Sequence, residues 1–307
     1  MNDYLNVLHH AEQDAQASTP APDTGPEHMA DEFMNKHGNT EKALSSFAAL
    51  VTALTFAGSA SAQALTPPAA DLIKKELSAF YYSGKDMSAR VLMRLINSQG
   101  NVRERNMTML RTNKGEGGDQ RYLMVFDTPA DVKGMSFLIS KFAKGDDDRW
   151  MYLPGLKVVK RIAADDKKSS FVGSDFTYED VSGRDIEEEK HTYVRADTVA
   201  GRPVHVVESR PVGTADYAMR SVWIDQERFL PLKEEYVNAQ GKALRSFTAD
   251  KVEEVGGRWT ITTRTMKNHQ TGHRTEVVFK DVKYDTGLSD DVFTERNMKN
   301  PVLGAKG

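Results

Sequence analysis

The chain has 307 residues, a formal net charge of −3 and no cysteine. Without cysteine it can form neither disulfides nor thiolate zinc sites, and it has no thiol nucleophile. The charge is unevenly distributed, because residues 1–62 carry eight acids and two bases, which leaves residues 63–307 with a net charge of +3. That balance is too weak for nucleic-acid binding, which requires strong, clustered basicity.

An apolar run at residues 47–58 is followed by a small-residue tripeptide at residues 60–62. The run is too short to span a bilayer, which needs roughly 20 residues. Residues 34–62 are therefore predicted to be a secretory signal peptide, cleaved near Ala62, which sends the protein to a periplasm. Residues 1–33 contain seven acids and no Lys or Arg. We expect Met34 to be the native start and residues 1–33 to be an upstream artefact; a genuine disordered acidic extension is the alternative.

The remainder, residues 63–307, is expected to form one domain, mostly of β-structure. The spacing of apolar residues predicts a single clear helix at residues 69–82, with Glu76 inside its apolar stripe. Alternating segments separated by short Gly, Asn and Asp turns predict an antiparallel meander that closes into a barrel or splits into a sandwich. At most thirteen strands are expected, at residues 87–97, 101–112, 120–127, 135–143, 148–153, 156–162, 189–197, 203–210, 216–225 and 229–238, with three more within 243–283.

Several strands in the first half are apolar on both faces, notably residues 122–126, 135–142 and 150–153. Such a strand must be covered on both sides, and the 69–82 helix is one candidate cover. The other cover is a second sheet, a partner or a ligand. Methionine is concentrated in these strands, and Met is typical of apolar surfaces that accommodate variable shapes, although plain core filling is the simpler interpretation. In the second half, Trp259, Ile261 and Thr263 alternate with residues 258, 260, 262 and Arg264, which predicts one buried and one solvated face.

No catalytic motif is recognisable, whether a zinc-protease helix, a nucleophile elbow or a phosphate-binding loop. Ser174 follows a glycine, but a tight turn explains it better than a nucleophile does. His269 and His273 flank a turn and could pair on a metal, although a solvated turn is favoured. We therefore predict no catalytic residues, no metal and no cofactor.

Four blocks of sequence carry a resemblance. RWMYLPGLKVVKRI at 149–162, SSFVGSDFTYED at 169–180, GRPVHVVESRP at 201–211 and DVFTERNM at 291–298 resemble the outer-membrane lipoprotein-sorting protein family, the LolA/LolB-like group, in an exporter-associated branch. The resemblance spans residues 66–300. It implies a strongly curved, unclosed antiparallel β-barrel, a half-barrel, whose open side is plugged by helices and whose concave apolar face holds acyl chains.

The function that this resemblance implies is a periplasmic carrier for the acyl chains of a lipoprotein or lipid. Alternatives are an accessory protein of an RND- or MMPL-type exporter of hydrophobic compounds and, with less support, a lipid or glycan hydrolase. Possible partners are an inner-membrane exporter or an outer-membrane receptor. The expected groove residues are Met93, Leu95, Met107, Met109, Met124, Phe126, Phe137, Ile139, Trp150 and Tyr152. Expected lid residues are Phe171, Phe176, Tyr178, Leu77 and Phe80, and expected headgroup or partner contacts are Lys157, Lys160 and Arg161.

Overall fold

A computed structural model describes residues 68–115 and 117–302. The expectations for residues 1–33 and for the signal peptide at 34–62 therefore lie outside the described residues. Helix α2 (Ala69–Tyr81) confirms the predicted helix. Thirteen strands follow, as the alternation predicted: β1 (Asp86–Ile96), β2 (Val102–Asn113), β3 (Gln120–Thr128), β4 (Ser136–Lys141), β5 (Asp148–Leu153), β6 (Val158–Ile162), β7 (Glu189–Val199), β8 (Arg202–Pro211), β9 (Met219–Asp225), β10 (Pro231–Val237), β11 (Ala243–Val255), β12 (Arg258–Asn268) and β13 (Arg274–Tyr284).

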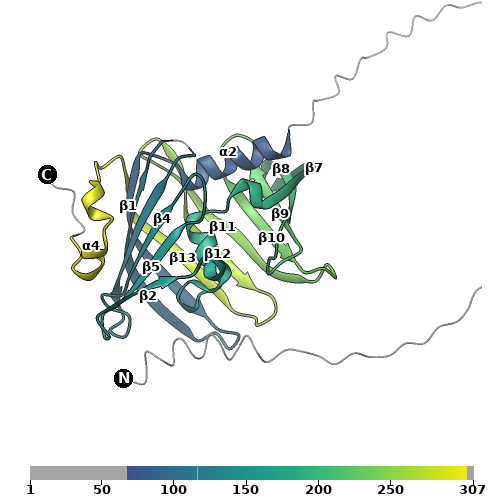
Figure 1. Cartoon of the computed structure of the whole chain (residues 1–307). Helices are drawn as coiled ribbons and strands as arrows, with labels where there is room; N and C mark the ends of the chain where they lie inside the picture. Colours follow the sequence, from purple (N-terminus) through teal and green to yellow (C-terminus); the bar gives the residue numbers. More distant parts are fainter. Residues whose placement is uncertain (1–67, 116, 303–307) are drawn as a thin grey trace, which may run out of the picture. The chain divides into compact units, whose positions relative to one another are not determined.

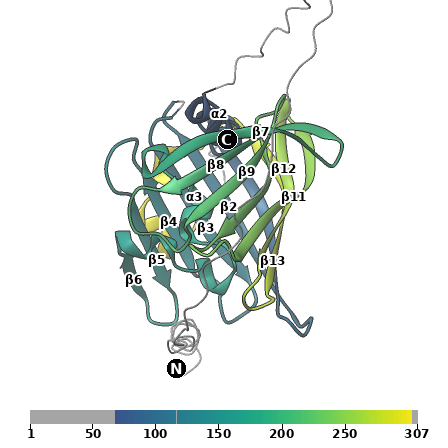
Figure 2. The same ribbon diagram turned by 90° about the vertical axis from the view of Figure 1, so that its right-hand side faces the viewer.

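All thirteen strands form one antiparallel sheet in the order β6-β5-β4-β3-β2-β1-β13-β12-β11-β10-β9-β8-β7. Every neighbouring pair is consecutive in sequence except β1 and β13. These are the first and last of the thirteen strands in sequence, and they pair with each other at the centre of the sheet. The edges, β6 and β7, do not pair with each other, so the sheet is curved but not closed (Figures 1 and 2). This arrangement confirms the predicted half-barrel and decides against a sandwich. Register shifts in β1, β2, β7, β10 and β11 increase the local twist and help the sheet to curl.

A segment that we call the plug, residues 163–188, connects the two edge strands. It contains the 3₁₀ turns η1 (Ala164–Lys168), η2 (Phe171–Gly173) and η3 (Ile186–Glu188) and one helical turn, α3 (Tyr178–Ser182). Aromatic residues of the plug share one buried cluster with residues of β1–β6 and of β11–β13. Because strands from both halves of the sheet contact the same segment, the sheet curls around the plug, which lies on its concave face.

The convex face is covered by the C-terminal segment, residues 285–302, which contains η4 (Asp290–Val292) and α4 (Glu295–Lys299). Val292, Phe293 and Met298 of this segment pack on side chains of β2–β5 that point away from the plug. The sequence predicted that these strands are covered on both faces, but the covers are the plug and the C-terminal segment rather than a second sheet, a partner or a ligand. Helix α2 reaches this cluster only with its C-terminal end, at Phe80. It packs mainly on β7, β8 and β12, and Leu72 and Ile73 share a cluster with Val207 of β8 and Val222 of β9.

The C-terminal segment is attached to the beginning of the sheet by Asp86. Its carboxylate accepts hydrogen bonds from the backbone N–H and the hydroxyl of Thr286, both at 2.7 Å, and from the N–H groups of Gly287 at 2.8 Å and Leu288 at 3.2 Å. Burial acts to raise the pKa of Asp86, but these hydrogen bonds outweigh it and lower the pKa.

We predict that Asp86→Asn destabilises the protein by about 3 kcal/mol at pH 7, because an amide nitrogen then faces backbone donors. The native carboxylate is stabilising above its unfolded pKa, and this contribution is lost as the pH falls through the lower folded pKa. The difference between the two proteins should therefore shrink below about pH 4. Thermal unfolding at pH 7 and pH 3 measures it. Asp146→Asn, at an exposed position, is the control, and an equal loss in both variants at pH 7 would contradict the prediction.

Candidate functional site

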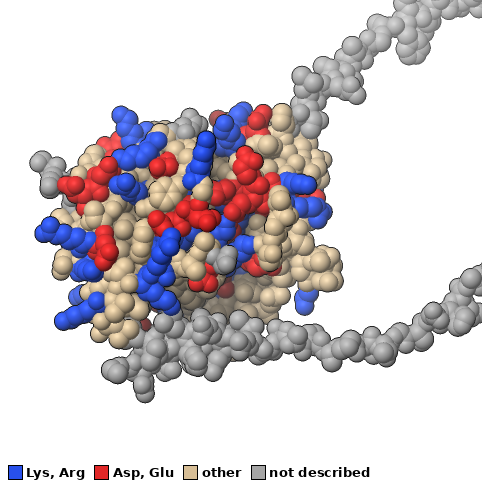
Figure 3. Space-filling model, viewed as in Figure 1, with Lys and Arg blue, Asp and Glu red and all other residues tan. Residues whose placement is uncertain are grey.

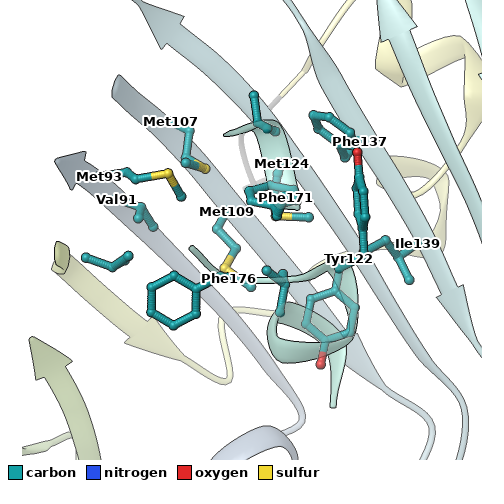
Figure 4. Packing of buried hydrophobic residues seen from close by; sticks show 14 of the residues in the cluster. Val91, Met93, Met107, Met109, Tyr122, Met124, Phe137, Ile139, Phe171 and Phe176 are labelled. Atoms are coloured by element: carbon teal, nitrogen blue, oxygen red, sulfur yellow. The ribbon is translucent and has the colours of Figure 1, made fainter. Parts of the chain in front are cut away.

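The concave face of β1–β4 is a wall of Met and aromatic side chains, which we call the Met wall: Val91, Met93, Met107, Met109, Tyr122, Met124, Phe126, Phe137 and Ile139 (Figure 4). Register explains why these residues meet. Met109 lies opposite Met124, and Met124 lies opposite Phe137, on three neighbouring strands. Because side chains alternate between faces along each strand, directly paired residues share a face. Seven predicted groove residues are thus brought together, and Leu95 packs at the margin of the same cluster.

Trp150 and Tyr152 do not belong to the Met wall. On β5 it is Met151 that pairs with Phe137 and faces the plug, whereas Trp150 pairs with Leu138 on the convex face. Trp150 and Tyr152 pack there in the cluster beneath the C-terminal segment. The expectation that they line the concave groove is therefore corrected. Alternate residues of a strand face opposite sides of the sheet. Residues 150–153 are apolar throughout, so the sequence does not indicate which of them face the concave side.

The plug inserts aromatic rings into the Met wall. The Phe171 ring lies 5.1 Å from the ring of Phe137 and 5.5 Å from that of Tyr178, measured between centroids. Phe171, Phe176 and Tyr178, all expected in a lid, are buried in the same cluster as the Met wall. Figure 4 shows Phe171 and Phe176 beside it. Val172 and Gly173 both adopt positive φ, which makes the tight turn that projects these rings. Of the two lid candidates on α2, Phe80 contacts the plugged cluster and Leu77 packs instead with β8 and β9.

Little space remains beside the Met wall. The cavity there has a volume of about 50 Å³ and is lined by Phe80, Met109, Leu230, Ile261 and Phe279, among others. That volume accommodates a few water molecules but not an acyl chain. In this structure the protein's own aromatic rings therefore occupy the Met wall.

Buried ion pairs hold the plug in place. Asp180, in α3, accepts hydrogen bonds from Arg184 at 2.6 Å and from Arg245, on β11, at 2.8 Å. Thr177 caps α3 through a reciprocal hydrogen-bond pair with Asp180. Burial acts to raise the pKa of Asp180, but Arg245 and Arg184 outweigh it and hold the pKa well below its usual range. Arg105, on β2, also donates to the carbonyl of Val172.

A second buried network lies under α2. Arg220 pairs with Glu189 at 2.6 Å and with Glu234 at 3.3 Å, and the hydroxyl of Tyr217 donates to Glu189. Glu76 of α2 is only 2% exposed, and its Oε2 atom has no hydrogen-bond partner. Burial first, and then the charge of Glu234, raise the pKa of Glu76 to about 8. The sequence contained a signal for this site, because a carboxylate stood in the apolar stripe of the predicted helix.

Arg264 is also inside the protein, which corrects the expectation that it lies on a solvated face. It is 9% exposed, whereas Trp259, expected on the buried face, is 38% exposed. The guanidinium lies among the rings of Phe279, Phe80 and Phe176, at 4.8, 5.3 and 5.4 Å from their centroids. Alternation failed here because the register between β11 and β12 shifts between Ile261 and Thr263, which brings Ile261 and Arg264 to the same cavity although they are three residues apart.

The outer side of the plug is strongly charged. Acidic side chains gather on this face of the molecule (Figure 3), and a cavity of about 460 Å³ lies between the plug and β7. Its lining mixes acids such as Glu179 and Glu188 with Lys167 and Arg184. Lys167 contacts both carboxylates. The lining has seven acids and four bases, so this surface stays net acidic despite these ion pairs.

The predicted headgroup contacts lie away from the Met wall, at the β6 edge. Lys157 precedes β6 in a turn with positive φ, and Lys160 and Arg161 are exposed on the strand. Arg161 is ion-paired with Asp148. The structure thus groups these three residues on an outer edge and does not bring them to the plugged interior.

Ser174, the possible nucleophile, and His269, the possible metal ligand, both have local hydrogen-bond partners. The Ser174 hydroxyl hydrogen-bonds the backbone of Phe176, and the ring of His269 contacts the Ser246 hydroxyl. Within residues 68–115 and 117–302, no three His, Asp or Glu side chains converge as metal ligands. No helix in this part of the chain is both long and apolar enough to cross a membrane.

Solved structures share this unclosed sheet. A domain named for outer membrane lipoprotein sorting, from Vibrio parahaemolyticus, is 32% identical with a TM-score of 0.69, and the match covers 75% of this chain and 98% of that one. A DUF1329 family protein from Desulfovibrio piger is 26% identical with a TM-score of 0.68, covering 75% and 97%. A LolA superfamily protein from Nitrosomonas europaea has the same fold, with 18% identity, a TM-score of 0.59 and coverage of 75% and 99%.

These matches define the class first: the protein is a LolA-like half-barrel. Within that class, the chain belongs to the family of outer-membrane lipoprotein-sorting proteins, as its sequence blocks suggested. A family model with the description "Uncharacterized protein" matches residues 118–300. A search of curated proteins gave no match.

The pKa of Glu76 leads to a stability prediction. Between about pH 4.5 and pH 8 the folded protein keeps a proton that the unfolded chain releases, so stability falls as the pH rises through this window. Glu76→Gln removes this loss. We expect the variant to have a larger free energy of unfolding than the parent at pH 8.5, by at most about 5 kcal/mol, and the same free energy of unfolding at pH 4.5. Its unfolding temperature should therefore be higher than that of the parent at pH 8.5 only.

Thermal unfolding at the two pH values measures this effect. Asp71→Asn, which removes the same charge from an exposed position on α2, is the control and should show no such pH dependence. A Glu76→Gln variant that is less stable than the parent at pH 8.5 would show that Glu76 is charged and paired in the folded protein.

Proposed function

We propose that this protein is a periplasmic carrier that binds the acyl chains of a lipoprotein or lipid against the Met wall. The observation that carries the proposal is that this wall is covered not by a second sheet but by the plug, a segment of short turns between the two free edges. Methionine side chains adapt to chains of different shape. Membership in the lipoprotein-sorting family supports the same function.

Binding in this proposal is an exchange. Acyl chains gain roughly 0.8 kcal/mol per CH₂ group that leaves water. The rings of Phe171, Phe176 and Tyr178 must leave the wall to make room, and the contact between Asp180 and Arg245 must open. These costs offset part of the gain. A carrier needs such an offset, because a chain that was bound at its full transfer energy would not be released.

The compartment and the partners are the finer parts of the proposal. The predicted signal peptide at residues 34–62 would deliver the protein to the periplasm. The exposed basic strip on and beside β6, Lys157, Lys160 and Arg161, would face anionic headgroups or a membrane partner, either an inner-membrane exporter or an outer-membrane receptor. Hydrolysis is not part of the proposal, since the Ser174 hydroxyl is used by the plug's own backbone.

The proposal predicts that fixing the plug abolishes binding. Asp175 in the plug and Thr275 on β13 are in contact, with 2.7 Å between the Thr275 hydroxyl and the Asp175 carboxylate. The chain has no other cysteine, so Asp175→Cys combined with Thr275→Cys gives one defined disulfide. We expect the oxidised protein to lose binding of an anthroyloxy-labelled palmitate by at least tenfold, and reduction to restore it.

Each single cysteine variant is a matched control and should bind in both redox states. Equal binding by the oxidised and reduced double variant would show that the plug does not gate the wall. Native mass spectrometry of the parent, purified from a host with its membranes, should also detect co-purified acyl compounds. If no acyl compound co-purifies with the parent, and the double variant binds labelled palmitate in neither redox state, the carrier function is wrong.

A further inference from the structure

Arg264 differs from the other buried arginines. Four of them are paired with carboxylates: Arg149 with Asp147, Arg184 with Asp180, Arg220 with Glu189 and Arg245 with Asp180. Two more, Arg105 and Arg111, donate to backbone carbonyls. Within the described residues, Arg264 makes neither kind of contact, and its guanidinium lies among aromatic rings instead. Its Nε atom is buried without a partner, as are those of Arg111 and Arg149.

The two carboxylates that act most strongly on the charge of Arg264, Asp180 and Glu234, already bind other side chains. Asp180 is shared between Arg184 and Arg245, and Glu234 binds Arg220 and the hydroxyl of Tyr236. Burial lowers the pKa of Arg264, while Tyr81, Asp180 and Glu234 partly compensate. A buried charge without an ion-pair partner costs stability, and three aromatic faces repay only part of that cost.

The position of Arg264 connects it to the proposed binding site. It lines the internal cavity of about 50 Å³, next to Met109 and Ile261. Two of the three rings around it come from the covers of the interior, Phe80 from α2 and Phe176 from the plug. Movement of the plug would therefore uncover a guanidinium at one end of the apolar wall and, at the same time, vacate the space beside it.

We propose that Arg264 is the receptor for an anionic group on the bound acyl compound, a carboxylate or a phosphate. A guanidinium presents a planar pair of donors that matches either group. The ligand then lies with its charged end against Arg264 and its chains along the Met wall towards Phe137. This inference rests on the carrier function and narrows its cargo to an anionic lipid or fatty acid, because the acyl-bearing end of a lipoprotein carries no such charge.

The test compares ligands that share a chain and differ in charge. Oleate, monooleoyl phosphatidate and uncharged monooleoylglycerol, each with one oleoyl chain, are titrated into the full chain as competitors of labelled palmitate. The parent should bind an anionic compound at least tenfold more tightly than monooleoylglycerol, and whether oleate or phosphatidate binds more tightly identifies the anionic group. Arg264→Met should abolish this preference while it keeps the affinity for monooleoylglycerol.

Two further variants make the result specific. Arg94→Met removes a charge from an exposed position on β1 and should leave the preference unchanged. Arg264→Lys keeps the charge without the planar donors and should retain part of the preference. Arg264→Met should also unfold at a higher temperature than the parent, since it replaces an unpaired buried charge with an apolar chain of similar length.

The outcomes separate the two proposals. Equal affinity of the parent for oleate, phosphatidate and monooleoylglycerol would overturn the role of Arg264 and leave the carrier function standing. A preference that survives in Arg264→Met would overturn it as well. Failure of the parent to bind any of the three compounds would overturn the carrier function and this inference together.

Discussion

A single layer of sheet with apolar side chains on both faces cannot be left in water, and the rest of this structure follows from that constraint. Strands β2–β5 carry the Met wall on one face and a second apolar patch on the other. The protein covers the convex patch with the C-terminal segment and the concave wall with the plug. Because the edge strands β6 and β7 do not pair with each other, the segment that joins them can lie inside the curve of the sheet.

The two covers are attached by different interactions. The C-terminal segment is held by apolar packing and by the hydrogen bonds to Asp86. The plug combines aromatic packing with buried ion pairs, chiefly between Asp180 and Arg245. Desolvation offsets much of the attraction in a buried ion pair, so such a pair fixes the position of a segment without adding much stability. In the proposed carrier, that balance would let the plug take one specific position against the wall and still leave it when a ligand binds.

Local pattern was sufficient to predict the strands, the first helix and seven of the nine residues of the Met wall, because alternation and turn chemistry are properties of neighbouring residues. The failures are all non-local. Trp150 and Tyr152 lie in a run, residues 150–153, that is apolar throughout, so nothing in that run indicated their face. The alternation of β12 predicted a solvated Arg264. Its burial depends on rings from α2 and the plug, which the pattern of one strand does not contain. The ion pairs around Asp180 join residues up to 65 positions apart, beyond the reach of any spacing rule.

The pairing of β1 with β13 has a consequence for how the chain reaches this structure. The strands before and after the plug form two uninterrupted meanders, β1–β6 and β7–β13, and only that central pairing joins them within the sheet. Each meander can form from contacts between neighbours, whereas the pairing must wait until almost the whole chain is present and must close a loop of most of its length. Such a step raises the contact order and slows folding. During that delay the Met wall has no complete enclosure, which makes the newly synthesised chain most vulnerable to aggregation before its last strand arrives.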